Sequence, residues 1–352
     1  MKGQQPKISY FEKWVDPVAI ERIAADGSVS LLCQRYDDPE AVNRAALDQA
    51  HGYQIAPRVE LHSPWFADAD LIARHPDLLA ICSTGSGYDV IDVDACTASG
   101  IIVCNQAGAN AQAVAEHAVA MMLALSKRLV ATDRAVRRPE QVERFGYPGE
   151  DLYEKTVGII GLGHIGRRIA EICRHGFNMR VLAHDPYLSN DEIEARGATA
   201  CDLDRVLAES DFVSVNCPRT SETMGMFDAS AFGRMKPTAH FINTARGGIH
   251  DEDDLTAALS ARTIAGAGLD VFLQEPPAHD HPLLSHDNVI ANPHIAGLTH
   301  ESLYKMSLSA AEQWIAIFRG EIPQRLINPE VWPAYCERFE QAFGFRPENL
   351  KN

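Results

Sequence analysis

The stretch "GIIGLGHIGRRIAE" at Gly158–Glu171 decides the fold of this chain. An apolar run ends at Ile160, glycines follow as Gly161, Gly163 and Gly166, and a helical pattern begins among them. The first glycine permits a tight turn, the second lets a phosphate approach the backbone, and the third lets helix and strand pack closely. The helix N-terminus then offers N–H groups and a positive dipole end to phosphates. The stretch therefore predicts a dinucleotide-binding βαβ unit.

A second apolar run, "RVLAHD", ends in Asp185, about 20 residues after the last glycine, as this fingerprint requires. A carboxylate there accepts hydrogen bonds from ribose hydroxyls and repels a 2′-phosphate. The next residues, "PYLSN", contain no arginine that would pair with a phosphate. The sequence thus predicts NAD rather than NADP, although an aspartate before Pro186 could also serve only as a turn residue.

The remaining length indicates a second domain, since 352 residues suffice for two. Before Asn105, short apolar runs such as "KISYF" and "LLAICS" alternate with helix-like stretches, which predicts parallel βαβ units without a phosphate fingerprint. From Thr156 the same rhythm restarts with cleaner strands. A long amphipathic stretch at 301–318 follows, and the tail from Ile327 shows little periodicity, so we expect it to pack on a surface.

Composition excludes several functions. The net charge of −16 argues against nucleic acid or an anionic membrane surface as a partner. The longest apolar stretch, "AVAEHAVAMMLALS", contains Glu116 and His117 and is too short to span a bilayer. None of the eight cysteines forms a C-x-x-C pair, so we expect no metal site of that kind, and we expect core thiols in a reducing cytoplasm.

Polar residues follow the predicted strands of the second half of the chain. In an open parallel sheet, ligands bind beyond the carboxyl ends of the strands, so residues at these positions converge on one edge. They are Asp185, then Asn216-Cys217-Pro218, Thr244-Ala245-Arg246, Asp270, and Pro293-His294.

The residue types at this edge suit hydride transfer to a 2-oxo acid. Arg246 can hold a carboxylate with its forked guanidinium. His294 can supply a proton near neutral pH, and a nearby carboxylate, Glu275, would favour its imidazolium form. Taken singly, each has an ordinary alternative: a surface loop, a turn before Pro276, or one of the 14 histidines that merely fills a polar position.

The segments "GHIG", "NTARGG", "GAGLDVFLQEP" and "NPHIAG", in this order, resemble the D-isomer-specific 2-hydroxyacid dehydrogenases. The resemblance extends through "STGSGYDVID", "AVAEHA" and "LINPEVW" and covers about Leu79 to Trp332. The best match is the branch of phosphoglycerate dehydrogenases and hydroxypyruvate and glyoxylate reductases.

The resemblance implies an α/β protein in which a Rossmann-type NAD-binding domain, 109–301, is inserted into a flavodoxin-like substrate-binding domain formed by 1–108 and 302–352. It makes Arg246 the substrate-binding arginine, Glu275 the supporting carboxylate and His294 the acid/base, and it places the substrate carboxylate on backbone N–H groups near Ser86 and Gly87. It also implies a homodimer paired through the cofactor domains. The implied NAD contacts are Gly161, Gly163, His164, Ile165, Gly166, Asp185, Cys217, Thr244, Arg246, Asp270 and His294.

The substrate is less defined. Asn216 and Arg219 stand where many relatives have histidine and leucine, and Asn292 stands where a threonine is common. Arg58 lies where phosphoglycerate enzymes carry a phosphate-binding element, but "VEL" follows without hydroxyls. We expect a 3-phosphoglycerate dehydrogenase-like enzyme. A hydroxypyruvate/glyoxylate reductase and a non-catalytic, NADH-sensing corepressor-like protein remain the alternatives.

Overall fold

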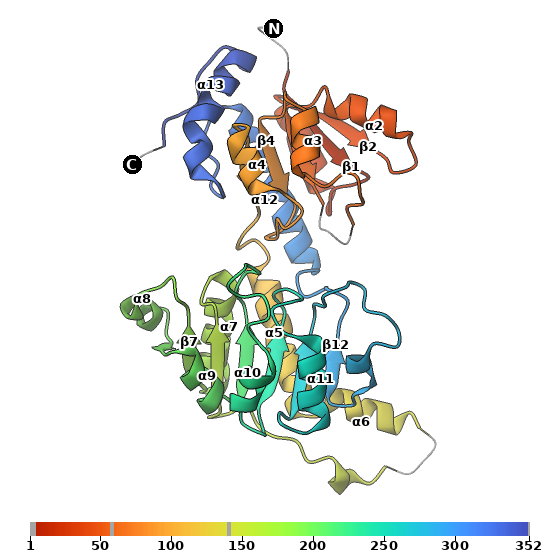
Figure 1. The fold of residues 1–352 in the computed structure, drawn as a ribbon, viewed down its shortest axis with the longest axis vertical. Coiled ribbons are helices and arrows are strands. Elements are labelled where there is room, and N and C mark those ends of the chain that lie inside the picture. The colour runs from red at the N-terminus through yellow and green to blue at the C-terminus, as the bar shows by residue number, and fades with distance from the viewer. Residues whose placement is uncertain (1–4, 57–59, 139–141, 351–352) are drawn as a thin grey trace. The chain divides into compact units, whose positions relative to one another are not determined.

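The computed structural model describes residues 5–56, 60–138 and 142–350, and the chain forms two compact units (Figure 1). One unit consists of Met1–Asn110 and Thr299–Asn352, and the other of Ala111–Leu298. The second unit is therefore inserted into the first along the chain. The two units are described separately below.

The first unit is built on a five-stranded sheet in the order β2-β1-β3-β4-β5. All of its strand pairs are parallel. This order is that of the flavodoxin-like folds, as the sequence resemblance implied. The strands are β1 Lys7–Phe11, β2 Ser30–Gln34, β3 Gly52–Ile55, β4 Ala80–Ser83 and β5 Ile102–Cys104.

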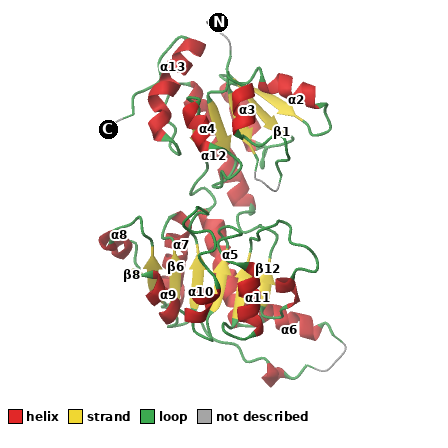
Figure 2. Ribbon diagram, viewed as in Figure 1, coloured by secondary structure: helices red, strands yellow, loops and turns green. Residues whose placement is uncertain are grey.

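Helices cover both faces of this sheet, so its strands read as nearly continuous apolar runs (Figure 2). Ile8 and Tyr10 join one core with Trp314, whereas Tyr53 and Ile55 join the core on the other face. The helices are α1 Val18–Asp26, α2 Glu40–Leu47, α3 Ala69–Arg74, α4 Val93–Ala98, α12 His300–Phe318 and α13 Trp332–Phe343, with a 3-10 turn at Pro329–Val331.

The C-terminal segment completes this unit. Trp314 of α12 is fully buried, and its indole Nε1 donates a hydrogen bond of 2.6 Å to Gln54 Oε1 on β3. Asn328 accepts from Val103 N at 2.8 Å and donates to Ile101 O at 3.0 Å, so the chain after α12 lies along the β5 edge. Both contacts join residues more than 200 positions apart in sequence.

The expectation that the tail lacks periodicity is wrong. Residues Trp332–Phe343 form α13, and Trp332, Tyr335 and Phe339 are buried in the core that contains Trp314. Their spacing is helical, and the proline lies in the first turn, where its missing N–H costs nothing.

The second unit contains a seven-stranded parallel sheet in the order β12-β11-β10-β9-β6-β7-β8. Counted from β6, this is the Rossmann order with one further strand at the β12 edge. The strands are β6 Thr156–Ile160, β7 Arg180–His184, β8 Thr199–Ala200, β9 Phe212–Val215, β10 His240–Asn243, β11 Gly266–Leu269 and β12 Val289–Ala291. The short β8 has no counterpart in the sequence prediction.

Alternate side chains of this second sheet enter two cores. On β10, Phe241 packs on one face and Ile242 on the other. The helices are α5 Ala111–Ser126, α6 Leu129–Val136, α7 His164–Phe177, α8 Asn190–Ala195, α9 Leu203–Glu209, α10 Ala229–Arg234 and α11 Glu252–Ser260, with 3-10 turns at Arg144–Gly146 and Pro282–Ser285. Both faces are covered, which leaves the ends of the strands as the places for a site.

Replacing Trp314 with alanine should lower the unfolding free energy of the first unit by about 3–5 kcal/mol, because it removes a fully buried indole and leaves Gln54 Oε1 without its donor. Chemical denaturation followed by circular dichroism measures the change. Val42→Ala, at a side chain that is 53% exposed, is the control and should shift stability by less than about 0.5 kcal/mol. Equal effects would contradict the role of α12 in the core.

Candidate active site

Parallel register brings the predicted site residues to one edge of the second sheet. The last residues of neighbouring strands pair directly: Val215 with Asn243, Asn243 with Leu269, and Leu269 with Ala291. On the other side of β9, Ile160 pairs with Val215 and with His184. The residues directly after these strand ends therefore form a row along the edge of the sheet: Asp185, Gly161, Asn216, Thr244, Asp270 and Asn292.

Glu275 and His294 meet at this edge although 19 positions separate them. His294 Nδ1 lies 2.7 Å from Glu275 Oε2, and Glu275 Oε1 accepts a hydrogen bond of 3.0 Å from Phe272 N. Because Nδ1 donates to the carboxylate, the second ring nitrogen, Nε2, is the one left for a substrate. The carboxylate fixes the orientation of the ring.

The Arg246 loop is locked against the Glu275 loop. A Cβ atom on Gly247 would lie 1.8 Å from Phe272 O, so only glycine permits this approach of the two loops. Asn243 shapes the Arg246 turn, accepting from Ala245 N at 2.9 Å and donating to Arg246 O at 3.0 Å. Arginine, glutamate and histidine are thereby gathered from three different strand ends.

Glu275 is ionised in this setting. Burial raises the pKa of its carboxyl group, but the hydrogen bond and charge of His294, the Phe272 N–H and the charge of Arg246 outweigh burial. The net result is a pKa below the ordinary value of 4.5. A carboxylate held in this way favours a positive charge on the imidazole beside it.

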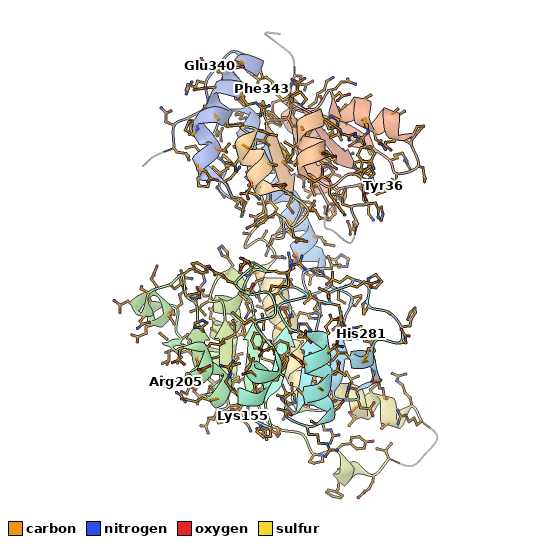
Figure 3. The ribbon with its side chains drawn as sticks, viewed as in Figure 1. Tyr36, Lys155, Arg205, His281, Glu340 and Phe343 are labelled. Carbon is orange, nitrogen blue, oxygen red and sulfur yellow. The ribbon has the colours of Figure 1, made fainter. Side chains whose placement is uncertain are left out.

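A further pair of hydrogen-bonded side chains supports the loop that carries Glu275. Glu252, at the start of α11, accepts from Leu273 N at 2.7 Å through one oxygen and lies 3.1 Å from His281 Nε2 through the other. His281 is labelled in Figure 3. Sequence reasoning missed Glu252, His281 and Asn243, because single polar residues near strand ends give no recognisable spacing.

Asp270 holds the turn that carries His294. Its two oxygens accept hydrogen bonds of 2.8 Å from Ile295 N and Ala296 N, and the residue is 1% exposed. His294 itself has a φ of +56°, which a residue other than glycine adopts only when its surroundings impose it. Asp270 is therefore a structural support of His294.

The glycine turn has the form that the sequence predicted. Gly161 has a φ of +87°, and a Cβ on Gly166 would lie 2.1 Å from Gly161 O. At Gly163 a Cβ would meet nothing within 4 Å, so the space beside it is open. Helix α7 starts at His164, followed by Ile165, and no side chain caps it. Its first N–H groups thus face an open cradle suited to a phosphate.

Asp185 lies beside this turn. It accepts from Leu162 N at 2.9 Å and from Tyr187 N at 3.1 Å, so it shapes both its own turn and the glycine loop. Arg196, which the sequence analysis did not consider, donates a 2.7 Å hydrogen bond to Leu162 O from just after α8. The loop is therefore tied down from two sides.

The other residues that were predicted to contact NAD lie at the same edge of the sheet. Burial raises the pKa of the Cys217 thiol to about 11, so the thiol is protonated at neutral pH. Thr244 is buried, and its hydroxyl oxygen has no partner among the described residues. Asn216, just after β9, donates through Nδ2 to Ser214 O of that strand at 2.9 Å. Arg219 donates to Gly247 O at 3.2 Å beside the Arg246 turn.

Ser86 and Gly87 belong to the first unit, in the loop after β4. Asn105 Nδ2 donates to Ser86 O at 2.8 Å, and the Ser83 hydroxyl donates to Gly87 O. These two hydrogen bonds hold the carbonyl groups of the loop in place. Arg58, the third predicted contact of this kind, lies outside the described residues.

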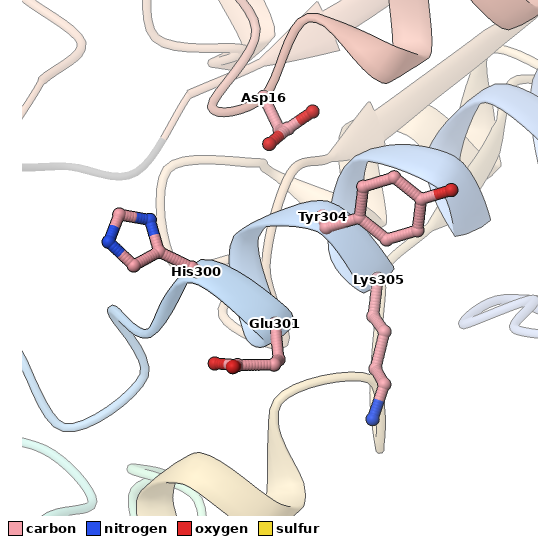
Figure 4. A pocket seen from close by; sticks show the side chains of 5 residues that line it. All are labelled: Asp16, His300, Glu301, Tyr304 and Lys305. Carbon is pink, nitrogen blue, oxygen red and sulfur yellow. The ribbon is translucent and has the colours of Figure 1, made fainter.

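A hollow of about 410 Å³ lies at the start of α12 in the first unit (Figure 4). His300, Glu301, Tyr304 and Lys305 line it together with Asp16. Figure 4 shows these side chains pointing in different directions rather than converging on one point. The hollow lacks the convergent polar groups of a reaction centre.

Comparison with known proteins agrees with this geometry. The family model described as "D-isomer specific 2-hydroxyacid dehydrogenase, NAD binding domain" matches residues 119–296, which is half of the chain. D-3-phosphoglycerate dehydrogenase of Archaeoglobus fulgidus is 40% identical over 77% of this chain, which spans about half (51%) of that protein's length. Glyoxylate/hydroxypyruvate reductase B of Salmonella gallinarum is 40% identical over 74% of this chain and 81% of its own.

A solved structure shares the fold. D-lactate dehydrogenase of Aquifex aeolicus, complexed with NAD and lactic acid, superposes with a TM-score of 0.78 at 29% identity and covers 91% of this chain and 98% of its own. This chain belongs to the D-isomer-specific 2-hydroxyacid dehydrogenase family. Its second unit is the NAD-binding domain of that family of oxidoreductases, and its cofactor is NAD.

The residues present fit that cofactor. The open space at Gly163, the uncapped start of α7 and the carboxylate of Asp185 lie where a pyrophosphate and a ribose would bind. Within 5–56, 60–138 and 142–350, no three His, Cys, Asp or Glu side chains are grouped to hold a metal ion. In the same ranges no helix is both long and apolar enough to cross a membrane.

Gly166→Ala should weaken NADH binding by about tenfold or more, because its Cβ would collide with Gly161 O and push the start of α7 away from the phosphates. Fluorescence titration with NADH measures the dissociation constant. Gly176→Ala lies on the same helix, where a Cβ meets nothing within 4 Å, and should leave the constant unchanged. Unaltered binding in Gly166→Ala would contradict the cradle.

Glu275→Gln should reduce stability by about 2 kcal/mol at pH 7, because the charge-assisted bond to His294 is lost. The pKa of Glu275 is below 4.5 in the native state and ordinary in the unfolded state. As the pH falls below 4.5, the unfolded state therefore binds a proton before the native state does. The stabilisation is therefore present above pH 4.5 and disappears as the pH falls through the native pKa.

Denaturation curves of wild type and Glu275→Gln, recorded from pH 7 down to pH about 3.5, test this linkage. The two proteins should converge in stability as the pH falls. The exposed Glu194→Gln is the matched control and should follow the wild type throughout. A difference that stays constant with pH would show that the carboxylate contributes nothing through its charge.

Proposed function

We propose that this protein is an NAD-dependent D-2-hydroxyacid dehydrogenase that interconverts a small 2-oxo acid and its 2-hydroxy acid. The observation that carries the proposal is the 2.7 Å pairing of His294 with Glu275 next to the Arg246 turn. Binding of NADH alone would not require a proton donor held by a carboxylate at this edge. The first unit is proposed as the substrate-binding domain.

Arg246 binds the substrate in this proposal. Its guanidinium can hold the carboxylate through two parallel hydrogen bonds and polarise the neighbouring ketone. The backbone amides near Ser86 and Gly87, in the first unit, are proposed as further substrate contacts. Two parallel hydrogen bonds from one guanidinium fix the plane of the substrate carboxylate, which helps to position the neighbouring oxo group.

His294 transfers the proton. In reduction, its Nε2–H donates to the carbonyl oxygen as that oxygen gains charge, and in oxidation the neutral ring takes the proton back. Glu275, bonded to Nδ1, keeps the ring oriented and stabilises the cationic form. Bound NADH supplies the hydride. Asp185 and the amides at His164 and Ile165 are proposed to hold its ribose and phosphates, with Cys217, Thr244 and Asp270 as further contacts.

The expected substrate type is that of 3-phosphoglycerate dehydrogenase, with hydroxypyruvate/glyoxylate reductase as the second candidate. Both activities are names of relatives that are 40% identical to this chain. The sequence "VEL" after Arg58 lacks the hydroxyls expected beside a phosphate, which weakens the case for a phosphorylated substrate. Turnover of a panel of acids decides between them.

We also propose a cytoplasmic homodimer that pairs through the NAD-binding units. Support for pairing comes from exposed apolar side chains between α6 and β6, where Val136 is 72%, Phe145 88% and Tyr153 61% exposed. Large apolar side chains exposed on one stretch of the chain are candidates for contact with a partner. Support for a cytoplasmic location comes from the eight cysteines, all of which are free thiols.

NADH oxidation at 340 nm should be seen with at least one of phosphohydroxypyruvate, hydroxypyruvate, glyoxylate and pyruvate. His294→Ala should lower kcat by about 100- to 10,000-fold while NADH still binds, because the proton donor is lost and the cradle is intact. His184→Ala serves as the control and should keep most of the activity. NADH binding without turnover across the panel would contradict the proposal and favour a sensing protein.

A further inference from the structure

A second histidine faces the support of the catalytic turn. His117 lies in α5, in the run "AVAEHAVAMM", and its Nε2 is 3.9 Å from Asp270 Oδ1. That nitrogen is buried and has no hydrogen-bond partner in the described part of the chain. The separation is too long for a hydrogen bond but short enough for a strong charge interaction. His117 has no role in the mechanism given above.

Asp270 must be ionised to hold the turn that carries His294. An ionised carboxylate accepts at both oxygens, and here it accepts from Ile295 N and from Ala296 N. A protonated carboxyl group would turn one acceptor into a donor and lose one of these amides. The turn would then be free to relax from the left-handed conformation of His294.

Burial works against that charge. Burial raises the pKa of Asp270, the amides of Ala296 and Ile295 oppose the rise, and the charges of His117 and His294 oppose it further. His117 approaches from α5, and His294 comes from the turn after β12. Beyond His294 lie Glu275, which is ionised, and Arg246. Because the charge of His294 changes during the reaction, His117 is the imidazole beside Asp270 whose charge is not part of the reaction.

We propose that His117 is a positioning residue for proton transfer: as a cation it keeps Asp270 ionised, and Asp270 in turn fixes the backbone turn that presents His294. The proposal rests on the proposed function for its meaning in catalysis. Its structural part concerns only the contact between α5 and the turn after β12.

The test compares His117→Gln with His117→Lys, since the two side chains have similar length and differ in charge. The first readout is hydrogen exchange, detected by mass spectrometry, in a peptide covering Ile295 and Ala296, with all variants compared at the same acidic pH. These amides should exchange about fivefold faster in His117→Gln and near the wild-type rate in His117→Lys. His175→Gln, on α7 of the same unit, should leave them unchanged.

The second readout is the pH profile of kcat with the best acid of the panel. Without a cation at position 117, Asp270 takes up its proton at higher pH, so the acid limb of the profile should move upward in His117→Gln. His117→Lys should restore the wild-type limb. KM for NADH is measured in parallel, because mere damage to the cofactor site would raise KM without moving the limb.

The two readouts separate the possible failures. Unchanged exchange in His117→Gln would overturn the proposal, because the turn after β12 would then not depend on His117. Equal effects of the glutamine and lysine variants would also overturn it, because the contact would then act through packing and not through charge. Faster exchange in His117→Gln with rescue by lysine, in a protein that turns over no acid, would support the coupling and contradict the proposed function instead.

Discussion

The parallel register of the second sheet is the constraint on which the site depends. Because Val215, Asn243, Leu269 and Ala291 end their strands side by side, the next residue of each strand faces the same edge. The side chains that shape the site follow within a few positions of those ends. A slip of one residue in one strand would turn the following side chain to the other face of the sheet.

The loops at that edge are held by polar side chains, two of them carboxylates, rather than by apolar packing. Asp270 supports the His294 turn, Glu252 supports the segment that leads to Glu275, and Asn243 supports the Arg246 turn. Each support is a buried or half-buried polar group that accepts backbone N–H groups or donates to a backbone carbonyl. Such a network is rigid only while its groups keep their ionisation state, which links the geometry of the site to pH.

Most elements of the fold were predictable, because the apolar runs of a covered parallel sheet are continuous and easily found. The glycine turn and Asp185 followed from one fingerprint, and the Rossmann-type domain followed from the resemblance to the family. Helix α13 was not predicted, although Trp332, Tyr335 and Phe339 have helical spacing, because the prolines of this segment argued against a helix. The supports Glu252 and Asn243 were missed for a different reason: their partners are backbone groups, which no sequence pattern reveals.

The sequence by itself determined the residue types of the site, the strands that carry them and the family to which the chain belongs. Only the tertiary structure decided that Glu275 binds Nδ1 of His294, that Gly247 locks two loops together, and that His117 faces Asp270. The physical reason is that strand periodicity is local, whereas contacts between loops depend on how strands far apart in the chain align.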